Sequence, residues 1–467
     1  MKVKRLTMQS FRGIGDLTLE FDQMEPTVLI GINGVGKSSI LDCLAILLTQ
    51  FTGQIQDSLE SLRFFITQDV TNRRDRTYNE ITVFIELQEL TWSMTEYKSA
   101  KNNDGKYIDL QAHIKSISDL KKEIKTKLKN YKGIQVDTIL MQSENMHIEI
   151  ANAIRSGLKE DLKIAIENLN NQLATIADTN VPLAVYYPVN RAVIDMPLEI
   201  SEISSFKQVD AYEQALTGGR IDFKTFFEWF RNREDLENER RRDNPDYRDK
   251  QLEAVRQAIS SLIPEFLNLR VERSPLRMTV RKKGEELIVN QLSDGEKCLL
   301  AMVGDLARRL AIANPGLTEP LEGEGVVLID EIELHLHPKW QREIIPALTR
   351  TFPNCQFIVT THSPQVISQV KPEGIYILEK TDEGVVAKRP ESSFGRDSNR
   401  ILEDLMGVPA RPQEIKDRLH ELFRLIDEGN LDGARQLSQE IADIIGQDEP
   451  ELVKASVSIR RKEILKR

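Results

Sequence analysis

The segment from residue 27 to residue 48 contains the residue types that bind nucleotide phosphates. Residues 27–30 are apolar or β-branched and predict a short buried strand. Residues 31–38 then have the pattern G-x-x-x-x-G-K-S, and apolar residues at helical spacing follow as far as Leu48. Strand, glycine loop and helix in this order are the context in which the pattern, the Walker A motif, binds phosphate. The alternative is an ordinary glycine turn.

Each residue type in this loop has an expected task. Glycine lets the backbone turn tightly, so that N–H groups and the positive end of the following helix face phosphate oxygens. We expect Lys37 to reach the β- and γ-phosphates of ATP, and the Ser38 hydroxyl to bind Mg²⁺. The predicted ATP-binding residues of the loop are Gly31, Asn33, Gly34, Gly36, Lys37, Ser38 and Ser39.

A second candidate site lies in residues 325–338, where a buried strand ends in two acidic residues. We expect Asp330 to hold Mg²⁺ beside the phosphate loop, and Glu331 to orient or deprotonate the attacking water. The alternative is a strand end followed by a helix cap. His335 and His337 form an H-x-H pattern, but no third ligand is evident, so the sequence does not predict a metal site there.

Residues 291–298, QLSDGEKC, predict the start of a helix, because Ser293 and Glu296 have the spacing of a helix cap. His362 follows another apolar strand further along the chain. The LSDGE segment, residues 292–296, resembles the signature segment of ABC-type ATPases. Phosphate loop, signature, acidic pair and histidine occur in the order of that family, which the chain resembles. The resemblance implies that Ser293, Gly295 and Glu296 bind ATP and that His362 is the switch histidine.

The same resemblance implies a dimer. In ABC-type ATPases the signature segment of one subunit completes the nucleotide site of the other, so one copy of each motif implies a homodimer at minimum. The interval between Lys37 and Ser293 is longer than in transporter domains and too short for the coiled-coil arms of SMC proteins. The chain is therefore most similar to the RecF/OLD-like group, although no Toprim or HNH nuclease motif is evident.

Five longer sequence blocks resemble the PtuA family more specifically. Proteins of this family are the ATPase subunits of Septu and of some retron-associated anti-phage systems. These blocks are YYPVNRAV, FFEWFRNREDLENE, QLSDGEKCLLAMVGDLARRLA, DEIELHLHPKWQREIIPAL and SFGRDSNRILEDLMGVP, and they cover most of residues 1–411. The resemblance implies a higher-order assembly with a PtuB-like HNH nuclease, and nucleic acid bound through that complex. The alternatives are a RecF-like repair ATPase that recognises DNA structures and a nucleotide-gated scaffold with little turnover. The glutamine of the usual Q-loop has no clear counterpart, and Asn190-Arg191 is the candidate position.

Composition bounds the class of protein. The chain has 467 residues and a formal net charge of −10, so its global charge does not indicate nucleic-acid binding. Its three cysteines, Cys43, Cys298 and Cys355, lack metal-site spacing and predict buried thiols in a reducing compartment. No run approaches 18 apolar residues and the first residues lack a signal-peptide core, so we expect a cytoplasmic protein without a membrane partner.

The motifs divide the chain into four expected parts of an α/β fold. Residues 1–204 form a first ATPase lobe, with strands at 2–9, 17–21 and 81–87 and a lysine-rich, mainly helical insertion at 92–180. A solvated surface is the simpler interpretation of that insertion, and a nucleic-acid or partner surface is the alternative. Residues 205–290 form a helical lobe with an aromatic cluster and a hairpin at 278–289. Residues 291–411 complete the ATPase core, and the unalternating apolar runs 326–329, 356–361 and 375–378 predict parallel strands.

Residues 412–467 are expected to form a helical tail. Ile415, Leu419, Leu422 and Ile426 are spaced 4-3-4 and line one helix face. A second set, Ala434, Leu437, Ile441 and Ile444, lines another helix after a break at residues 428–430. A helical hairpin of this kind either packs on its own ATPase core or forms an assembly surface.

Overall fold

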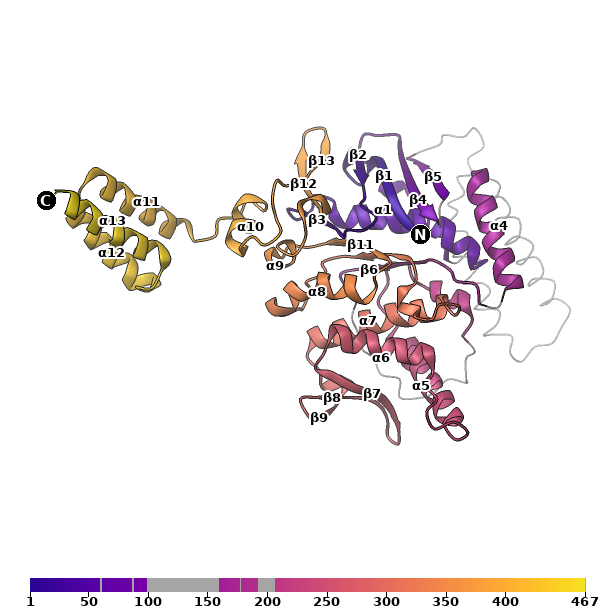
Figure 1. The fold of residues 1–467 in the computed structure, drawn as a ribbon. Coiled ribbons are helices and arrows are strands. Elements are labelled where there is room, and N and C mark those ends of the chain that lie inside the picture. The colour runs from indigo at the N-terminus through magenta and orange to yellow at the C-terminus, as the bar shows by residue number, and fades with distance from the viewer. Residues whose placement is uncertain (59–60, 86–87, 99–158, 177, 192–205, 467) are drawn as a thin grey trace. The chain divides into compact units, whose positions relative to one another are not determined.

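The computed structural model describes residues 1–58, 61–85, 88–98, 159–176, 178–191 and 206–466. The chain forms two compact units, Met1–Gly395 and Arg396–Arg467 (Figure 1). The second unit begins before residue 412, where the helical tail was expected to start. Most of the predicted lysine-rich insertion, residues 99–158, lies outside the described residues.

A six-stranded sheet forms the centre of the first unit, in the order β13-β12-β3-β11-β10-β6. Its strands are β3 (Thr27–Gly31), β6 (Leu183–Tyr187), β10 (Gly325–Ile329), β11 (Cys355–Thr360), β12 (Ile375–Thr381) and β13 (Gly384–Lys388). All pair in parallel except β13, which is antiparallel to β12. The predicted α/β fold of a P-loop ATPase is confirmed, because the unalternating apolar runs form strands buried on both faces.

An antiparallel sheet in the order β2-β1-β4-β5 lies with helix α1 (Lys37–Ile55) on one side of the central sheet (Figure 1). Its strands are β1 (Lys2–Phe11), β2 (Ile14–Glu20), β4 (Arg76–Ile85) and β5 (Gln88–Tyr97). The expectation that residues from 92 onward are helical is wrong for β5. Trp92 is buried in this strand, and its indole N–H donates to the Leu47 carbonyl of α1 at 2.9 Å. Helix α4 (Glu160–Thr175) lies within the predicted insertion and is helical as expected.

The helical lobe covers the other side of the central sheet (Figure 1). It contains α5 (Phe223–Arg240), α6 (Lys250–Leu262) and the three-stranded sheet β7 (Phe266–Arg273), β8 (Leu276–Lys282) and β9 (Glu285–Ile288). The hairpin predicted at residues 278–289 is confirmed as β8–β9, whereas β7 was missed. The aromatic cluster is core, as expected, since Phe223, Phe226, Phe227, Trp229 and Phe230 are all buried. The other helices in the described part of the first unit are α7 (Asp294–Ala313), α8 (Pro338–Thr351) and α9 (Pro364–Ile367).

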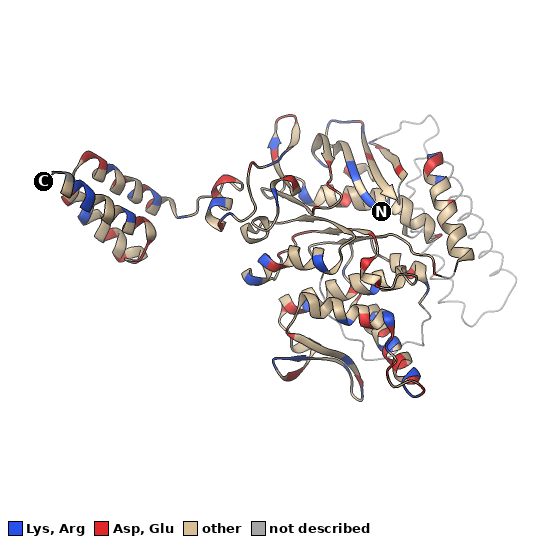
Figure 2. Cartoon of the chain, viewed as in Figure 1, with Lys and Arg blue, Asp and Glu red and all other residues tan. Residues whose placement is uncertain are grey.

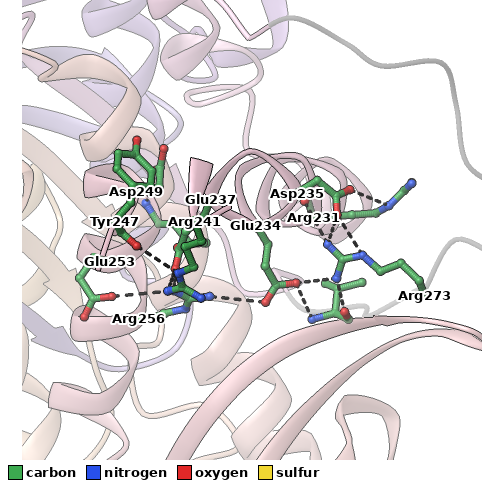
Figure 3. Close-up of polar contacts among 12 residues, drawn as sticks. Arg231, Glu234, Asp235, Glu237, Arg241, Tyr247, Asp249, Glu253, Arg256 and Arg273 are labelled. Carbon is green, nitrogen blue, oxygen red and sulfur yellow. Dashed lines mark hydrogen bonds and ion pairs between the residues drawn. The ribbon is translucent and has the colours of Figure 1, made fainter. Parts of the chain in front are cut away.

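Buried ion pairs hold the three-stranded sheet against the helices of this lobe (Figure 3). Basic and acidic residues are mixed along α5 (Figure 2), and two of its carboxylates are buried. Glu237 accepts from Arg256 of α6 at 3.0 Å, while Glu234 accepts from Arg273 of β7 at 2.6 Å and from the Val271 backbone N–H at 3.1 Å. Because the buried carboxylates are paired, α5, α6 and β7 form one block. Strand β8 pairs with β7, and its last residue, Lys282, contacts Glu296 at the start of α7.

The second unit contains four helices: α10 (Ser398–Asp404), α11 (Gln413–Glu428), α12 (Leu431–Ile445) and α13 (Pro450–Lys466). The predicted break is confirmed, with Gly429 in the left-handed region (φ 79°) and the Asn430 side chain accepting from the Gly433 N–H. Helix α13 lies within the predicted helical tail, although sequence analysis did not single it out. It adds Leu452, Ala455 and Ile459 to an apolar core shared with α11 and α12.

Candidate functional site

The phosphate loop joins β3 to α1, and its backbone requires glycine. Gly34 (φ 77°) and Gly36 (φ 112°) occupy the left-handed region that other residues rarely adopt. A Cβ on Gly31 would lie 2.5 Å from the Leu378 carbonyl oxygen of the neighbouring strand. The Lys37 ammonium turns back into the loop and donates to the Gly31 and Ile32 carbonyls at 2.9 and 3.1 Å. The loop therefore holds its cation at the position where the Walker A motif binds phosphate.

Three carboxylates act electrostatically on this cation. Burial lowers the pKa of Lys37, and the nearby carboxylates of Asp330, Glu331 and Glu333 oppose that shift. These acids follow β10, which is separated from β3 only by β11. The parallel topology thus brings the ends of β3 and β10 to the same edge of the sheet, as the sequence predicted for the Walker A loop and the acidic pair.

A threonine of the intervening strand fixes the acidic pair. Asp330 is buried, and its Oδ1 accepts from the Thr360 hydroxyl at 2.5 Å. The same hydroxyl oxygen accepts from the Glu331 backbone N–H at 2.7 Å, and Glu331 itself lies in the left-handed region at φ 45°. This single hydroxyl sets the direction of the chain at the predicted catalytic acid, in a conformation that few non-glycine residues adopt.

The donor set at the loop suits Mg²⁺. Ser38 follows Lys37 at the start of α1 and offers a hydroxyl, and Asp330 offers a carboxylate oxygen beyond the one bonded to Thr360. Mg²⁺ prefers hard oxygen ligands of this kind and is usually bound by one or two side chains together with substrate phosphates. With ATP present, Ser38 and Asp330 are the residues that would hold the ion.

The predicted switch histidine is held by an acid that sequence analysis did not single out. Glu333 accepts from the His362 backbone N–H at 2.5 Å and from the Thr361 hydroxyl at 2.7 Å. Ser363 caps α9 by accepting from the backbone N–H groups of Gln365 and Val366. The His362 segment is therefore tied to the turn after β10. The local signal for Glu333 was a third acidic residue in the D-E-I-E segment, residues 330–333.

The signature segment forms the helix cap that the spacing of Ser293 and Glu296 predicted. The Ser293 backbone N–H and hydroxyl donate to Glu296 at 3.0 and 2.9 Å, and the other Glu296 oxygen accepts from Lys282 at the end of β8. A Cβ on Gly295 would lie 2.2 Å from the His335 carbonyl oxygen, so only glycine fits there. Among the described residues, these contacts join the signature to Lys282 and to the loop after the acidic pair, and none joins it to the phosphate loop.

The far half of the signature helix is bound to the central sheet by a buried charge cluster. Asp305 accepts from the Tyr187 hydroxyl of β6 at 2.9 Å, from Arg308 at 2.8 Å and from Arg309 at 2.7 Å. Arg309 also donates to the Ala211 and Glu213 carbonyls. Helix α7 and strand β6 are therefore expected to move together.

We expect acid to destabilise the protein through Asp305. Burial raises the pKa of Asp305, but Arg309 and Arg308 lower it by more, so that the pKa is about 2 instead of the ordinary 3.8. Because the folded-state pKa is depressed, this stabilisation is complete above the unfolded pKa and is lost as the pH falls from about 4 to about 2; it is on the order of 2 kcal/mol. Urea unfolding at several pH values should show a shallower acid slope for Asp305→Asn than for the wild type. Parallel slopes would contradict this role.

The histidine pair and the cysteines carry no metal site in the described part of the chain. No group of three or more His, Cys, Asp or Glu side chains is placed to bind a metal among these residues. The three cysteines are free and buried, as expected. Within the same residues, α1 is the one helix long and apolar enough to cross a membrane, and 83% of its apolar window is buried inside the protein.

Comparisons with known proteins identify the family of this chain. A family model described as an AAA ATPase domain matches residues 1–367. The retron Ec83 probable ATPase of Escherichia coli is 30% identical and covers 99% of this chain and 87% of its own length. The Septu protein PtuA of Bacillus thuringiensis is also 30% identical, but over 31% of this chain and 39% of its own length. Among solved structures, an SMC head domain from Thermotoga maritima aligns over 84% of this chain and 100% of its own length, with 16% identity and a TM-score of 0.39.

These matches correct the extent of the resemblance read from the sequence blocks. The PtuA match is partial, whereas similarity to the retron ATPase extends along nearly the whole chain. The chain belongs to the AAA ATPase-domain family and is a probable ATPase related to that of retron Ec83.

Proposed function

We propose that this protein is the ATP-hydrolysing subunit of an anti-phage defence complex of the retron or Septu type. The observation that supports hydrolysis best is the pairing of the Lys37 loop with the Thr360-bound acidic pair at one edge of the sheet. The support for a defence role is the similarity to the retron Ec83 probable ATPase over nearly the whole chain.

Each residue of the site has a distinct task in this proposal. The loop N–H groups and Lys37 bind the β- and γ-phosphates of ATP. Ser38 and Asp330 hold Mg²⁺, which neutralises charge that develops on the phosphates. Glu331 orients the attacking water and accepts its proton, and His362 contacts the γ-phosphate from the end of β11.

The proposed active site is completed by a second copy of the chain. Ser293, Gly295 and Glu296 stand at the N-terminus of α7, where helix N–H groups favour an anion. Their described contacts within one chain do not include the phosphate loop, which is consistent with binding the γ-phosphate of a partner subunit's ATP. For Ser293 to do so, its hydroxyl must exchange its bond to Glu296 for one to phosphate.

Nucleic-acid degradation is assigned to a different subunit. The PtuA-like sequence blocks imply a partner of the HNH nuclease class, so ATP turnover here would restrain or release that partner. The proposed complex acts in the cytoplasm, contacts nucleic acid through its nuclease and contains at least one homodimer of this chain.

Co-expression with its neighbouring genes tests this function directly. We expect the purified chain to release phosphate from ATP and to co-purify with an HNH-class protein. Isolated chain that binds DNA tightly only with ATP would instead indicate a repair ATPase. Purified chain that retains ATP without releasing phosphate would indicate a nucleotide-gated scaffold.

The helices of the second unit allow a separate test of assembly. Because α11, α12 and α13 share their own apolar core, we expect a chain that ends at Gly395 to stay folded and to bind ATP. Loss of higher-order assembly or of partner co-purification, measured by light scattering and pull-down, would identify the unit as an assembly surface. If the shortened chain is insoluble or melts far below the wild type, the unit instead stabilises the ATPase and this expectation is wrong.

A further inference from the structure

Arg191 is a buried arginine at the position where the Q-loop residue was sought. It lies four residues after the end of β6 and is 1% exposed. Its guanidinium donates to the carbonyl oxygens of Asp330 and Pro188, and to that of Glu331 at 2.8 Å. The side chain therefore faces the backbone of the acidic pair.

The charge of this guanidinium has no carboxylate partner among the residues described. Burying an arginine is costly unless its donors are satisfied. Backbone carbonyl oxygens accept from both terminal nitrogens of Arg191, whereas its buried Nε–H has no partner among the described residues. Arg191 also donates to the Ile332 carbonyl, so it binds three consecutive carbonyls, of Asp330, Glu331 and Ile332, in the turn that follows β10. The guanidinium thus holds the backbone of this turn in one conformation.

The peptide groups on both sides of Glu331 are consequently fixed. Its N–H donates to the Thr360 hydroxyl at 2.7 Å, and its carbonyl accepts from Arg191 at 2.8 Å. With φ at 45°, Glu331 depends on such contacts, because an uncommon backbone conformation persists only where the surroundings determine it. Removing the Arg191 contacts should let this residue relax and its carboxylate change direction.

The backbone of Arg191 also joins the turn to the helical lobe. Its carbonyl accepts from the Ile221 N–H at 3.0 Å, just before α5 begins. On the sheet side, the Asp330 N–H donates to the carbonyl of Tyr187, whose hydroxyl bonds Asp305 of the signature helix. Arg191 is therefore placed between the acidic turn and the lobe that carries the signature.

We propose that Arg191 is a positioning residue that directs the Glu331 carboxylate through the peptide carbonyls of the turn, so that movement of the helical lobe reaches the base. This inference rests on the proposed ATPase function, since it assigns Glu331 the role of base. Arg191 does not contact nucleotide in it. Its expected effect is on turnover and not on ATP affinity.

A double-mutant cycle with Glu331 tests the proposal. Arg191→Lys keeps the charge but offers fewer donors in a different geometry, so kcat should fall about 10- to 100-fold while the ATP dissociation constant stays within about threefold. In the Glu331→Gln background, the same substitution should change the residual turnover by less than about twofold. Arg191→Gln, which keeps an uncharged donor, replaces the lysine variant if that variant does not fold.

Arg309→Lys is the matched control. Arg309 is also a buried arginine that binds backbone carbonyls, but its described contacts do not include the acidic turn. Any loss of turnover in this variant should be the same in both backgrounds, because it does not act through Glu331. The proposal is overturned if Arg191→Lys lowers kcat by the same factor in the wild-type and Glu331→Gln backgrounds. It is also overturned if Arg191→Lys weakens ATP binding as much as it slows turnover.

Hydrogen exchange separates this inference from the proposed function. Without nucleotide, the amides of residues 331–334 should exchange about tenfold faster in Arg191→Lys than in the wild type, and unchanged in Arg309→Lys. Unchanged exchange of this turn in Arg191→Lys would reject the positioning role even if ATP is hydrolysed. If the turn exchanges faster in Arg191→Lys but the wild-type protein shows no ATP turnover, the positioning of the turn is supported and the ATPase function is rejected.

Discussion

Lys37→Ala is expected to abolish measurable ATP binding. The substitution removes the cation that the loop holds at its centre, and it leaves Asp330, Glu331 and Glu333 uncompensated near the triphosphate. Loss of charge-assisted bonds to two phosphates together with added repulsion should weaken affinity on the order of 100-fold or more. Titration with a fluorescent ATP analogue measures this directly.

An exposed lysine provides the control for that experiment. Lys371 pairs with Glu25 on the surface of the same unit, so Lys371→Ala removes an equal charge away from the loop. ATP affinity should be unchanged in this variant. If Lys37→Ala binds ATP within about threefold of the wild type, the loop does not bind phosphate as described.

Glu331→Gln is expected to separate binding from hydrolysis. The amide has the size of the carboxylate and keeps the backbone bonds to Thr360 and Arg191, so ATP should still bind. An amide cannot accept the proton of the attacking water, and turnover should fall by a factor on the order of 10² or more. Phosphate release at saturating ATP, with equilibrium binding on the same protein, gives both quantities.

The neighbouring acid distinguishes a catalytic role from a structural one. Glu333 accepts from the backbone and side chain of the His362 segment, so Glu333→Gln should lower the melting temperature and slow turnover less than Glu331→Gln does. Equal loss of ATP binding in both variants would show that Glu331 supports the structure of the turn. It would then not be the base.

Local patterns were sufficient for four strands of the central sheet, β3, β10, β11 and β12, and for the acidic and phosphate-binding motifs. Unalternating apolar runs identified β3, β10 and β11, and glycine spacing identified the loop whose positive φ angles require it. Strand β5 was missed because Leu90 and Trp92, its buried residues, stand within a polar stretch. Whether such a stretch is half-buried depends on α1, which lies far away in the sequence.

The residues that fix the site were harder to predict because their contacts join distant segments. Thr360 reads as an ordinary strand residue until β11 lies beside β10. Arg191 was noted only as a replacement for an expected glutamine, and nothing local indicates that its guanidinium binds carbonyls about 140 residues further along the chain. The sequence of the signature could not distinguish a helix cap from a phosphate contact, because both use the same Ser293 hydroxyl.

The composite site is the central claim, and a mixing experiment tests it most directly. Lys37→Ala and Ser293→Arg proteins should each be inactive alone, because one lacks a working phosphate loop and the other a working signature. In a mixed dimer, one site pairs the intact loop with the intact signature. With free exchange, half of the dimers are mixed and half of their sites work, so roughly a quarter of wild-type phosphate release should return. No recovery, once a pull-down with two tags has confirmed mixed dimers, would contradict a site shared between two chains.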